Sequence, residues 1–212
     1  MTYRGRIALL FLSLLTSFFY YVLGNELSLL SLVFSLLHAA VSWVFGGWYD
    51  KYRFLSYHDP LTGVYNRRYA HFIFEKKLHQ ARNRNERLGI LLIDVNNFKV
   101  INDTYGHDDG DFILKETCRI IQNSMDKKDI LIRWGGDEFL VLLTNRDDGD
   151  IRKFIHQMND DIVIARSECE EKNKIFPSLS IGFSCYPKDA TKISELISIA
   201  DKRMYQAKDN AN

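Results

Sequence analysis

Three acidic residues stand at positions where a folded chain could use them for chemistry. Asp94 lies at the end of the apolar run GILLIDV, which predicts a buried central strand, and Asp137 and Glu138 follow two glycines between further apolar runs. A carboxylate at a buried strand is costly unless it is paired or binds a cation. Mg²⁺ takes hard oxygen ligands, usually one or two carboxylates together with substrate phosphates. Two strands that bring these acids to one edge of a sheet would form a phosphoryl-transfer site.

An ordinary turn with solvated acids explains the same residues. For a Gly-Asp pair alone, that interpretation is the commoner one. Gly135 and Gly136 change the balance only slightly, because backbone without a Cβ can approach a phosphate closely. The acids and glycines by themselves leave both interpretations open.

The elements that would position these residues follow from the hydrophobic pattern after residue 59. Apolar residues at helical spacing, short apolar runs and turn signals alternate along this part of the chain. They predict helices over 66–87, 98–105, 110–125, 151–172 and 193–207, and strands over 89–95, 130–134, 138–143 and 175–184. Helices interleaved with strands that include one hairpin predict an α+β fold, with helices packed over a mostly antiparallel sheet.

The first quarter of the chain has a different composition. Between Arg6 and Asp50 the only formally charged side chain is Glu26. A hydrocarbon core of roughly 30 Å needs about 20 apolar residues in a helix, so residues of about 7–24 and 27–48 read as two membrane spans. A signal peptide is the alternative for the first span, but no clear small-x-small cleavage site follows it.

The two predicted spans are separated only by a few residues around Asn25, which requires an antiparallel hairpin. Basic residues flank both ends of this hairpin: Arg4, Arg6, Lys51 and Arg53. The positive-inside tendency places that side in the cytoplasm and predicts a multi-pass protein of the cell membrane. We expect a membrane anchor over 1–49, a helical linker over 50–58 and a cytoplasmic domain over 59–212.

Charge and cysteine content exclude some classes of function. The formal net charge is +1, which argues against a nucleic-acid partner held by a basic face. The three cysteines, Cys118, Cys169 and Cys185, have no CxxC spacing and give no metal signature.

Five segments of the sequence carry a resemblance to a known family. Residues 133–139 read RWGGDEF, which resembles the signature of the GGDEF family, the diguanylate cyclases. Four more segments look like parts of the same family, in its order and spacing: DPLTGVYNRRY at 59–69, DVNNFKVINDTYGHDDGD at 94–111, SIGF at 180–183 and ADKRMYQAK at 200–208. The resemblance therefore covers the chain from about residue 59 to its end.

The resemblance implies roles for individual residues. A divalent cation, Mg²⁺ or alternatively Mn²⁺, would be held by Asp94, the Val95 carbonyl and Asp137, with Glu138 also within reach of metal. Glu138 would orient and help deprotonate the ribose 3′-hydroxyl that attacks the other nucleotide. Gly135 and Gly136 would let the backbone lie against the nucleotide.

The remaining implied contacts concern the nucleotide itself. Asn102 and Asp111 match the positions that recognise guanine, and an acid at 111 implies GTP, because a carboxylate accepts from guanine N1–H and N2–H. Two lysines match family positions that contact the phosphates: Lys99, which would act as a catalytic residue, and Lys208. Phe98 would bind substrate by packing near the base. Packing in the core is the commoner role for a residue of this kind, both for Phe98 and for Tyr105.

Three further residues are expected to have structural roles. Arg133 is expected to pair with a nearby acid or backbone group, and the segment that begins at Asp59 is more often structural than catalytic. Asn66 is expected to cap the first helix of the domain.

The sequence departs from the family pattern at three places. Asn96 stands where many members have a second aspartate, which removes one charge and predicts weaker metal binding. The family's RxxD inhibition site is here Asp126-Lys127-Lys128-Asp129, so product inhibition through it is not expected without the arginine. The family's arginine after the last helix is missing from Ala211-Asn212, which could reduce triphosphate binding.

The resemblance implies an enzyme that condenses two GTP into cyclic di-GMP and releases two pyrophosphates. Each domain would bind one GTP, so catalysis requires a homodimer, and downstream cyclic di-GMP effectors are implied partners. Two alternatives stay open: an inactive domain that binds GTP or cyclic di-GMP as a sensor or interaction module, and a membrane scaffold that binds no nucleotide.

Overall fold

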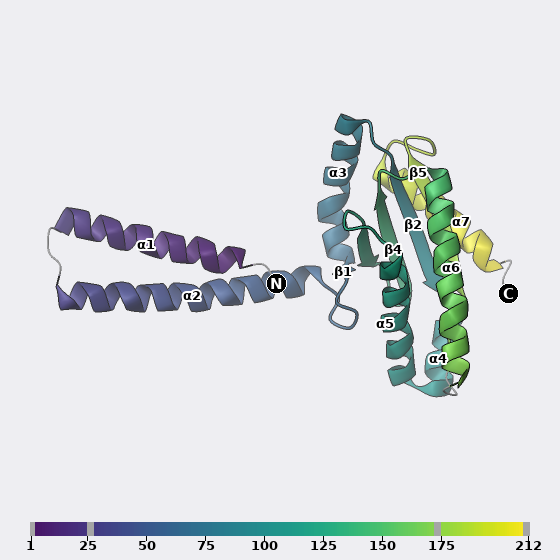
Figure 1. The fold of residues 1–212 in the computed structure, drawn as a ribbon, viewed down its shortest axis with the longest axis horizontal. Helices are drawn as coiled ribbons and strands as arrows, with labels where there is room; N and C mark the ends of the chain where they lie inside the picture. The colour runs from purple at the N-terminus through teal and green to yellow at the C-terminus, as the bar shows by residue number, and fades with distance from the viewer. Residues whose placement is uncertain (1–2, 25–27, 172–174, 210–212) are drawn as a thin grey trace. The chain divides into compact units, whose positions relative to one another are not determined.

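The computed structural model describes residues 3–24, 28–171 and 175–209. The chain divides into two compact units, Met1–Tyr57 and His58–Asn212. Each unit is described by itself below (Figure 1).

The first unit consists of two helices, α1 (Arg4–Gly24) and α2 (Leu29–Tyr57). By length and composition both could cross a membrane, and most of their apolar side chains are exposed, among them Phe11, Phe18 and Phe34. α2 continues without a break to Tyr57, so residues 50–57 belong to the same helix. Asn25 and Glu26, in the turn expected between the spans, lie outside the described residues.

The two helices pack most closely where α1 begins. The Asp50 carboxylate accepts hydrogen bonds from the backbone N–H groups of Gly5 (2.8 Å) and Arg6 (3.2 Å), and so satisfies two free donors of the first turn of α1. A Cβ on Gly46 would lie 2.5 Å from Arg6 Cα, so only glycine permits this approach. The start of α1 therefore lies beside residues 46–50 of α2, as an antiparallel hairpin requires.

The second unit is a five-stranded sheet covered by helices on both faces. Its elements in chain order are β1 (Tyr65–Asn66), α3 (Arg67–Arg84), β2 (Leu88–Val95), α4 (Phe98–Tyr105), α5 (His107–Asn123), β3 (Ile130–Arg133), β4 (Glu138–Thr144), α6 (Asp148–Glu171), β5 (Leu179–Tyr186) and α7 (Ile193–Asp209). The strand order is β1-β3-β4-β2-β5, and all pairs are antiparallel except β1 with β3. The predicted α+β fold with a mostly antiparallel sheet is confirmed.

Two details of the strand prediction were wrong. The two-residue strand β1 was missed, because two residues carry no periodicity. β5 begins at Leu179 and not at residue 175, because Pro177 has no N–H to donate to a strand ladder. Phe176 is nevertheless buried in the core, which explains why its apolar run resembled a strand.

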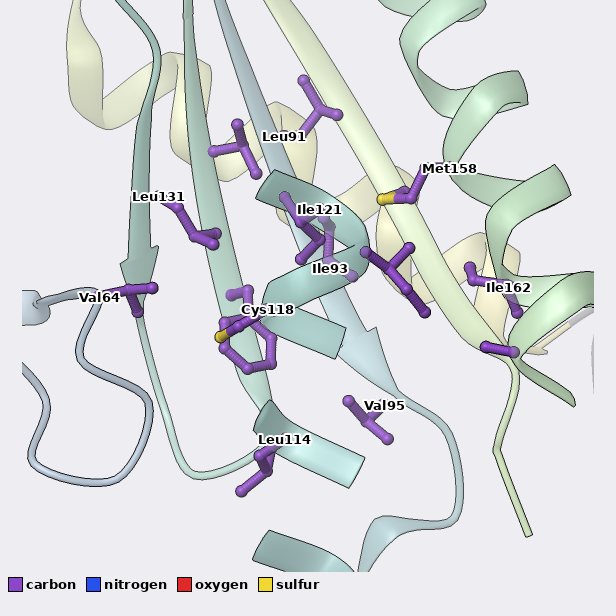
Figure 2. Packing of buried hydrophobic residues seen from close by; sticks show 14 of the residues in the cluster. Val64, Leu91, Ile93, Val95, Leu114, Cys118, Ile121, Leu131, Met158 and Ile162 are labelled. Atoms are coloured by element: carbon purple, nitrogen blue, oxygen red, sulfur yellow. The ribbon is translucent and has the colours of Figure 1, made fainter. Parts of the chain in front are cut away.

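The central strand β2 divides the core into two layers. All eight of its residues are buried, and their side chains alternate between the two faces. Leu91, Ile93 and Val95 pack with residues of α5 and α6, as Figure 2 shows, whereas Leu88, Ile90 and Leu92 join the cluster under α3 and α7. Because both faces are covered, β2 is fixed in register between β4 and β5.

Gly182 provides a test of this packing. It pairs with Leu92 in the sheet, and a Cβ at this position would overlap the Ala200 carbonyl oxygen and the Met204 nitrogen of α7. These are backbone atoms, so relief requires a shift of the whole helix. We expect Gly182→Ala to lower the free energy of unfolding by about 2–3 kcal/mol, or roughly 5–10 °C in Tm, measured by circular dichroism.

Gly149→Ala is the matched control, since Gly149 lies in the first turn of α6, where a Cβ meets only the Asp147 side chain. Its Tm should stay the same or rise slightly. Equal Tm values for the two variants would contradict the proposed contact between β5 and α7.

Candidate functional site

The sheet brings the predicted acids together at one end of β2. Asp94 pairs in register with Glu138 of β4 on one side and with Ser180 of β5 on the other. Asp94 is buried, with 6% of its surface exposed, and Glu138 is half-buried. Asp94 and Asp137 were expected on two strands of the sheet, but β4 begins at Glu138, which is the acid paired with Asp94, and Asp137 lies in the preceding turn.

The hairpin between β3 and β4 places Asp137 beside the same strand end. The N–H groups of Trp134 and Gly135 both donate to the Glu138 carbonyl, at 2.8 and 3.2 Å. The Asp137 carbonyl accepts the Val95 N–H at 3.2 Å. The backbone of the turn is thus hydrogen-bonded to the end of β2.

The two glycines of this hairpin have different surroundings. A Cβ on Gly135 would lie 2.6 Å from Glu138 Oε2, so this glycine makes room for the Glu138 carboxylate. A Cβ on Gly136 would meet nothing within 4 Å. The expected approach of the protein backbone at Gly136 to the nucleotide therefore remains a prediction, while Gly135 already has a role in the folded chain.

Arg133 fixes the hairpin from its outer side. Its guanidinium donates to the Gly136 carbonyl at 2.7 and 3.2 Å and to the Asp59 carboxylate at 3.0 and 3.2 Å. Both side chains of the ion pair are only 15% exposed. Burial raises the pKa of Asp59, but hydrogen bonds from Thr62 and Arg133 outweigh it and hold that pKa below its usual value. The structural roles expected of Arg133 and Asp59 are confirmed.

Asn66 and Phe98 also behave as expected from the sequence. The Asn66 side chain accepts from the Tyr69 N–H and caps α3. Phe98 is partly buried and packs against the core. Tyr105 does not, since 51% of its surface is exposed, so the expectation of core packing was wrong for this residue. It is the last residue of α4, and Gly106 alone separates it from α5.

Lys208 reaches the acids from α7. Its ammonium donates to Asp94 Oδ1 at 2.6 Å, and this hydrogen bond raises the pKa of Lys208. The pKa of Glu138 is also raised, first by burial and then by the negative charges of Asp137, Asp94 and Asp201, while Lys208 opposes the shift. One end of the sheet therefore concentrates negative charge that Lys208 only partly balances.

The predicted guanine-binding residues lie on α4 and α5. A Cβ on Gly110 would overlap Asn102 Oδ1 and come within 3.3 Å of Phe98 Cζ, so the Asn102 side chain rests against the backbone that leads into Asp111. This close packing places Asn102 against Gly110, the residue that precedes Asp111. Lys99 is exposed on α4, and its predicted contact with phosphate is untested.

Asn96 has a role that its sequence position did not reveal. It is buried, its Nδ2 donates to Ser178 Oγ at 2.8 Å, and its Oδ1 accepts from Ser180 Oγ at 2.8 Å. The Asn96 N–H also donates to the Ser178 carbonyl at 3.0 Å. The side chain thus joins the exit of β2 to the start of β5 and is committed to the fold.

A second contact that the sequence did not predict involves the altered RxxD segment. The Arg146 guanidinium donates to Asp126 Oδ2 at 3.0 Å and to Asp129 Oδ2 at 2.7 Å. Arg146 comes from the β4–α6 connection, and no sequence signal marked it as a partner of this segment. Both aspartates of the altered RxxD segment are therefore paired within the chain.

The oxygen donors at the end of β2 fit a divalent cation. Within the described part of the chain, no group of three or more His, Cys, Asp or Glu side chains could hold an ion without other ligands. Mg²⁺, however, commonly uses one or two carboxylates and completes its shell with phosphate and water. Burial and then the charges of Asp137, Asp94 and Asp201 raise the pKa of Glu138, and a bound cation would offset both effects. Ala211 and Asn212, which follow the last helix where the family pattern has an arginine, lie outside the described residues.

Comparisons with known proteins agree with this geometry. The family described as "Diguanylate cyclase, GGDEF domain" matches residues 56–212. Diguanylate cyclase DosC of Escherichia coli (strain K12) is 33% identical over 150 residues, which cover 71% of this chain and 32% of DosC. The bifunctional diguanylate cyclase/cyclic di-GMP phosphodiesterase MucR of Pseudomonas aeruginosa is 35% identical over 159 residues, 73% of this chain and 22% of MucR. The matches thus span about a third or less of these relatives.

A solved structure supports the same assignment. The GGDEF domain of PA1120 (TpbB or YfiN) from Pseudomonas aeruginosa has a TM-score of 0.66 and 32% identity, and the match covers 73% of this chain and 90% of that one. The family match covers most of the chain, and the acids of the family signature lie at the end of β2. The chain therefore belongs to the GGDEF family of diguanylate cyclase domains.

Proposed function

We propose that the chain is a diguanylate cyclase, which condenses two GTP into cyclic di-GMP and releases two pyrophosphates. The observation that carries the proposal is the register of Asp94 with Glu138, beside the Asp137 turn. The names of DosC and MucR as diguanylate cyclases support the same reaction.

Glu138 is the proposed general base. Its raised pKa makes its carboxylate a better proton acceptor than an ordinary glutamate, and the space left by Gly135 keeps the carboxylate unobstructed. It would orient the ribose 3′-hydroxyl of one GTP and accept its proton as the oxygen attacks the α-phosphate of the other.

The nucleotide would be bound by residues from three helices. Asp111 would accept from guanine N1–H and N2–H, together with Asn102, which packs against Gly110 where α4 meets α5. Phe98 supports this junction from the core side. Lys99 and Lys208 would contact the phosphates, and Lys208 would then share its ammonium between Asp94 and the triphosphate.

A divalent cation fits the oxygen donors at this end of the sheet. Asp94, Asp137, Glu138 and the Val95 carbonyl would hold Mg²⁺, with Mn²⁺ as an alternative. The cation would supply charge neutralisation at the transferring phosphate.

The proposal includes a homodimer and a membrane anchor. Each domain offers one set of acids, so two domains must face each other to join two GTP molecules, and an anchor raises their local concentration. Exposed apolar side chains along α1 and α2 support two membrane spans, and the basic residues at the shared end of the hairpin support a cytoplasmic domain.

The decisive experiment compares the detergent-purified chain with its Glu138→Gln variant in GTP and Mg²⁺. We expect cyclic di-GMP from the wild type and a rate lower by about 10²–10⁴ in the variant, because the proton acceptor is lost while its shape is kept. Product is measured by mass spectrometry. Glu168→Gln, an exposed carboxylate on α6, is the matched control and should keep the wild-type rate.

The outcomes separate the competing functions. Wild-type chain that binds GTP without turnover would identify a sensor or interaction module, and absence of both would leave a scaffold. In the same assay, activity per molecule should rise with enzyme concentration, and a constant value across dilution would contradict the dimer.

The pH dependence of the rate tests the electrostatics of Glu138. As a base, Glu138 must be ionised, so activity falls as pH drops through its raised pKa. Asp201 on α7 contributes to that rise, so Asp201→Asn should lower the pKa of Glu138 and move the acidic limb of the kcat/KM profile to lower pH. Asp160→Asn, on the exposed surface of α6, should leave the profile unchanged. A shift to higher pH in Asp201→Asn would contradict the assignment.

Variants of Asn96 test whether this residue positions the end of β2 or whether its missing charge weakens metal binding. Asn96→Ala removes both side-chain hydrogen bonds to the serines and should lower the free energy of unfolding by about 1–3 kcal/mol. Asn96→Asp should be less destabilised than Asn96→Ala, because both serine hydroxyls can rotate to donate to a carboxylate. The Mg²⁺ concentration at half-maximal rate should stay unchanged in Asn96→Asp. A large decrease in that concentration would show instead that the missing charge weakens metal binding.

A further inference from the structure

A cavity of about 490 Å³ lies between α3 and α7, outside the proposed catalytic site. Its volume falls in the range of about 300–1,000 Å³ that is typical of small-ligand sites. Apolar side chains from both helices line its interior, including Phe74, Leu78 and Ile197. We propose that this cavity binds a small planar aromatic molecule that carries a negative charge.

Trp134 supplies the aromatic surface of the cavity. Its ring stacks near Phe74, with centroids 6.1 Å apart and an angle of 28°, and the Arg67 guanidinium lies 4.6 Å from the ring centroid. These contacts hold the indole in place before any ligand arrives, which lowers the entropic cost of binding. The indole remains partly exposed, so a flat ring has an ordered aromatic partner to pack against.

The charges around the opening select for an anion. Arg82 of α3 and Lys192, just before α7, carry permanent positive charges, whereas Glu75 is the one acid among the lining residues described. Lys192 pairs with Glu195 at 3.5 Å, but both side chains are at least half exposed, so this pair is weak and easily exchanged. His71 adds a further polar group at the rim. A carboxylate or phosphate on the ligand would complement this arrangement.

The position of Trp134 gives such a ligand access to the signature hairpin. Trp134 directly precedes Gly135, and its N–H donates to the Glu138 carbonyl at 2.8 Å. A ligand that packs on the indole therefore contacts the residue that opens the turn carrying Asp137 and Glu138. An effect of the ligand on turnover rests on the proposed function, whereas binding itself does not.

Tryptophan fluorescence can test binding directly. The chain has three tryptophans, so replacement of Trp43 and Trp48 by phenylalanine leaves Trp134 as the only one. In this full-length background, without GTP or metal, 4-nitrophenyl phosphate is titrated, since a nitroaromatic ring quenches indole fluorescence on contact. We expect saturable quenching, and affinity at least about tenfold weaker for the neutral analogue 4-nitrobenzyl alcohol, because it lacks a charge-assisted contact.

Matched variants locate the site. Arg82→Gln with Lys192→Gln should weaken the affinity for 4-nitrophenyl phosphate by about tenfold or more. Lys76→Gln with Lys202→Gln makes the same change of charge at exposed positions close in sequence on α3 and α7, outside the cavity lining, and should leave the affinity unchanged. All four side chains are exposed, and circular dichroism confirms that each variant is folded.

Competition with GMP then identifies the source of the ligand. Displacement of the probe would indicate a nucleotide, and no displacement would indicate a simpler aromatic acid; both outcomes retain the site. Quenching that rises linearly without saturation, or that is equal for the neutral analogue and for both pairs of variants, would overturn the proposal. Because no turnover is measured, an inactive chain would still give a clear answer.

Discussion

Burial of β2 on both faces is the constraint on which the arrangement of the acids depends. Side chains of β2 alternate between two core clusters, and a shift of one residue would exchange every one of them. This fixed register sets Asp94 opposite Glu138 and beside Ser180. The position of the acids is therefore determined by aliphatic packing some distance away. Burial of β2 thus both stabilises the core and positions the acids of the site.

Concentration of acids at this point has a cost that the chain only partly offsets. The raised pKa of Glu138 shows that burial and three neighbouring carboxylates disfavour its charge. Lys208 compensates Asp94 most directly, at 2.6 Å. A half-buried carboxylate such as Glu138 destabilises the folded domain while its charge is not neutralised. This is typical of a site where a bound ligand supplies the opposite charge. Asn96 shows the opposite case, because its amide is satisfied within the protein and adds no charge.

Sequence patterns predicted the helices and strands that have a local periodicity and the site residues that lie in contiguous motifs. The run GILLIDV indicated the central strand because burial on both faces leaves no polar alternation. The same patterns could not reveal the two-residue β1, or the effect of Pro177 on the start of β5. They also could not pair Arg146 with Asp126, since 20 residues separate them and neither position has a distinctive pattern. Such long-range polar contacts depend on how the helices and strands pack together in the folded domain.

The signature hairpin is held from several directions, and this has a consequence for how its acids can move. Arg133 ties the Gly136 carbonyl to Asp59, and the Asp137 carbonyl is bound to the Val95 N–H. Trp134 packs against α3 through Phe74. These contacts join the turn to the start of the domain, to the central strand and to a helix. The Gly136 and Asp137 carbonyls are both hydrogen-bonded, so displacement of the Asp137 backbone requires a change in at least one of those three neighbours. Any signal that reaches the acids must therefore act through the packing around the hairpin.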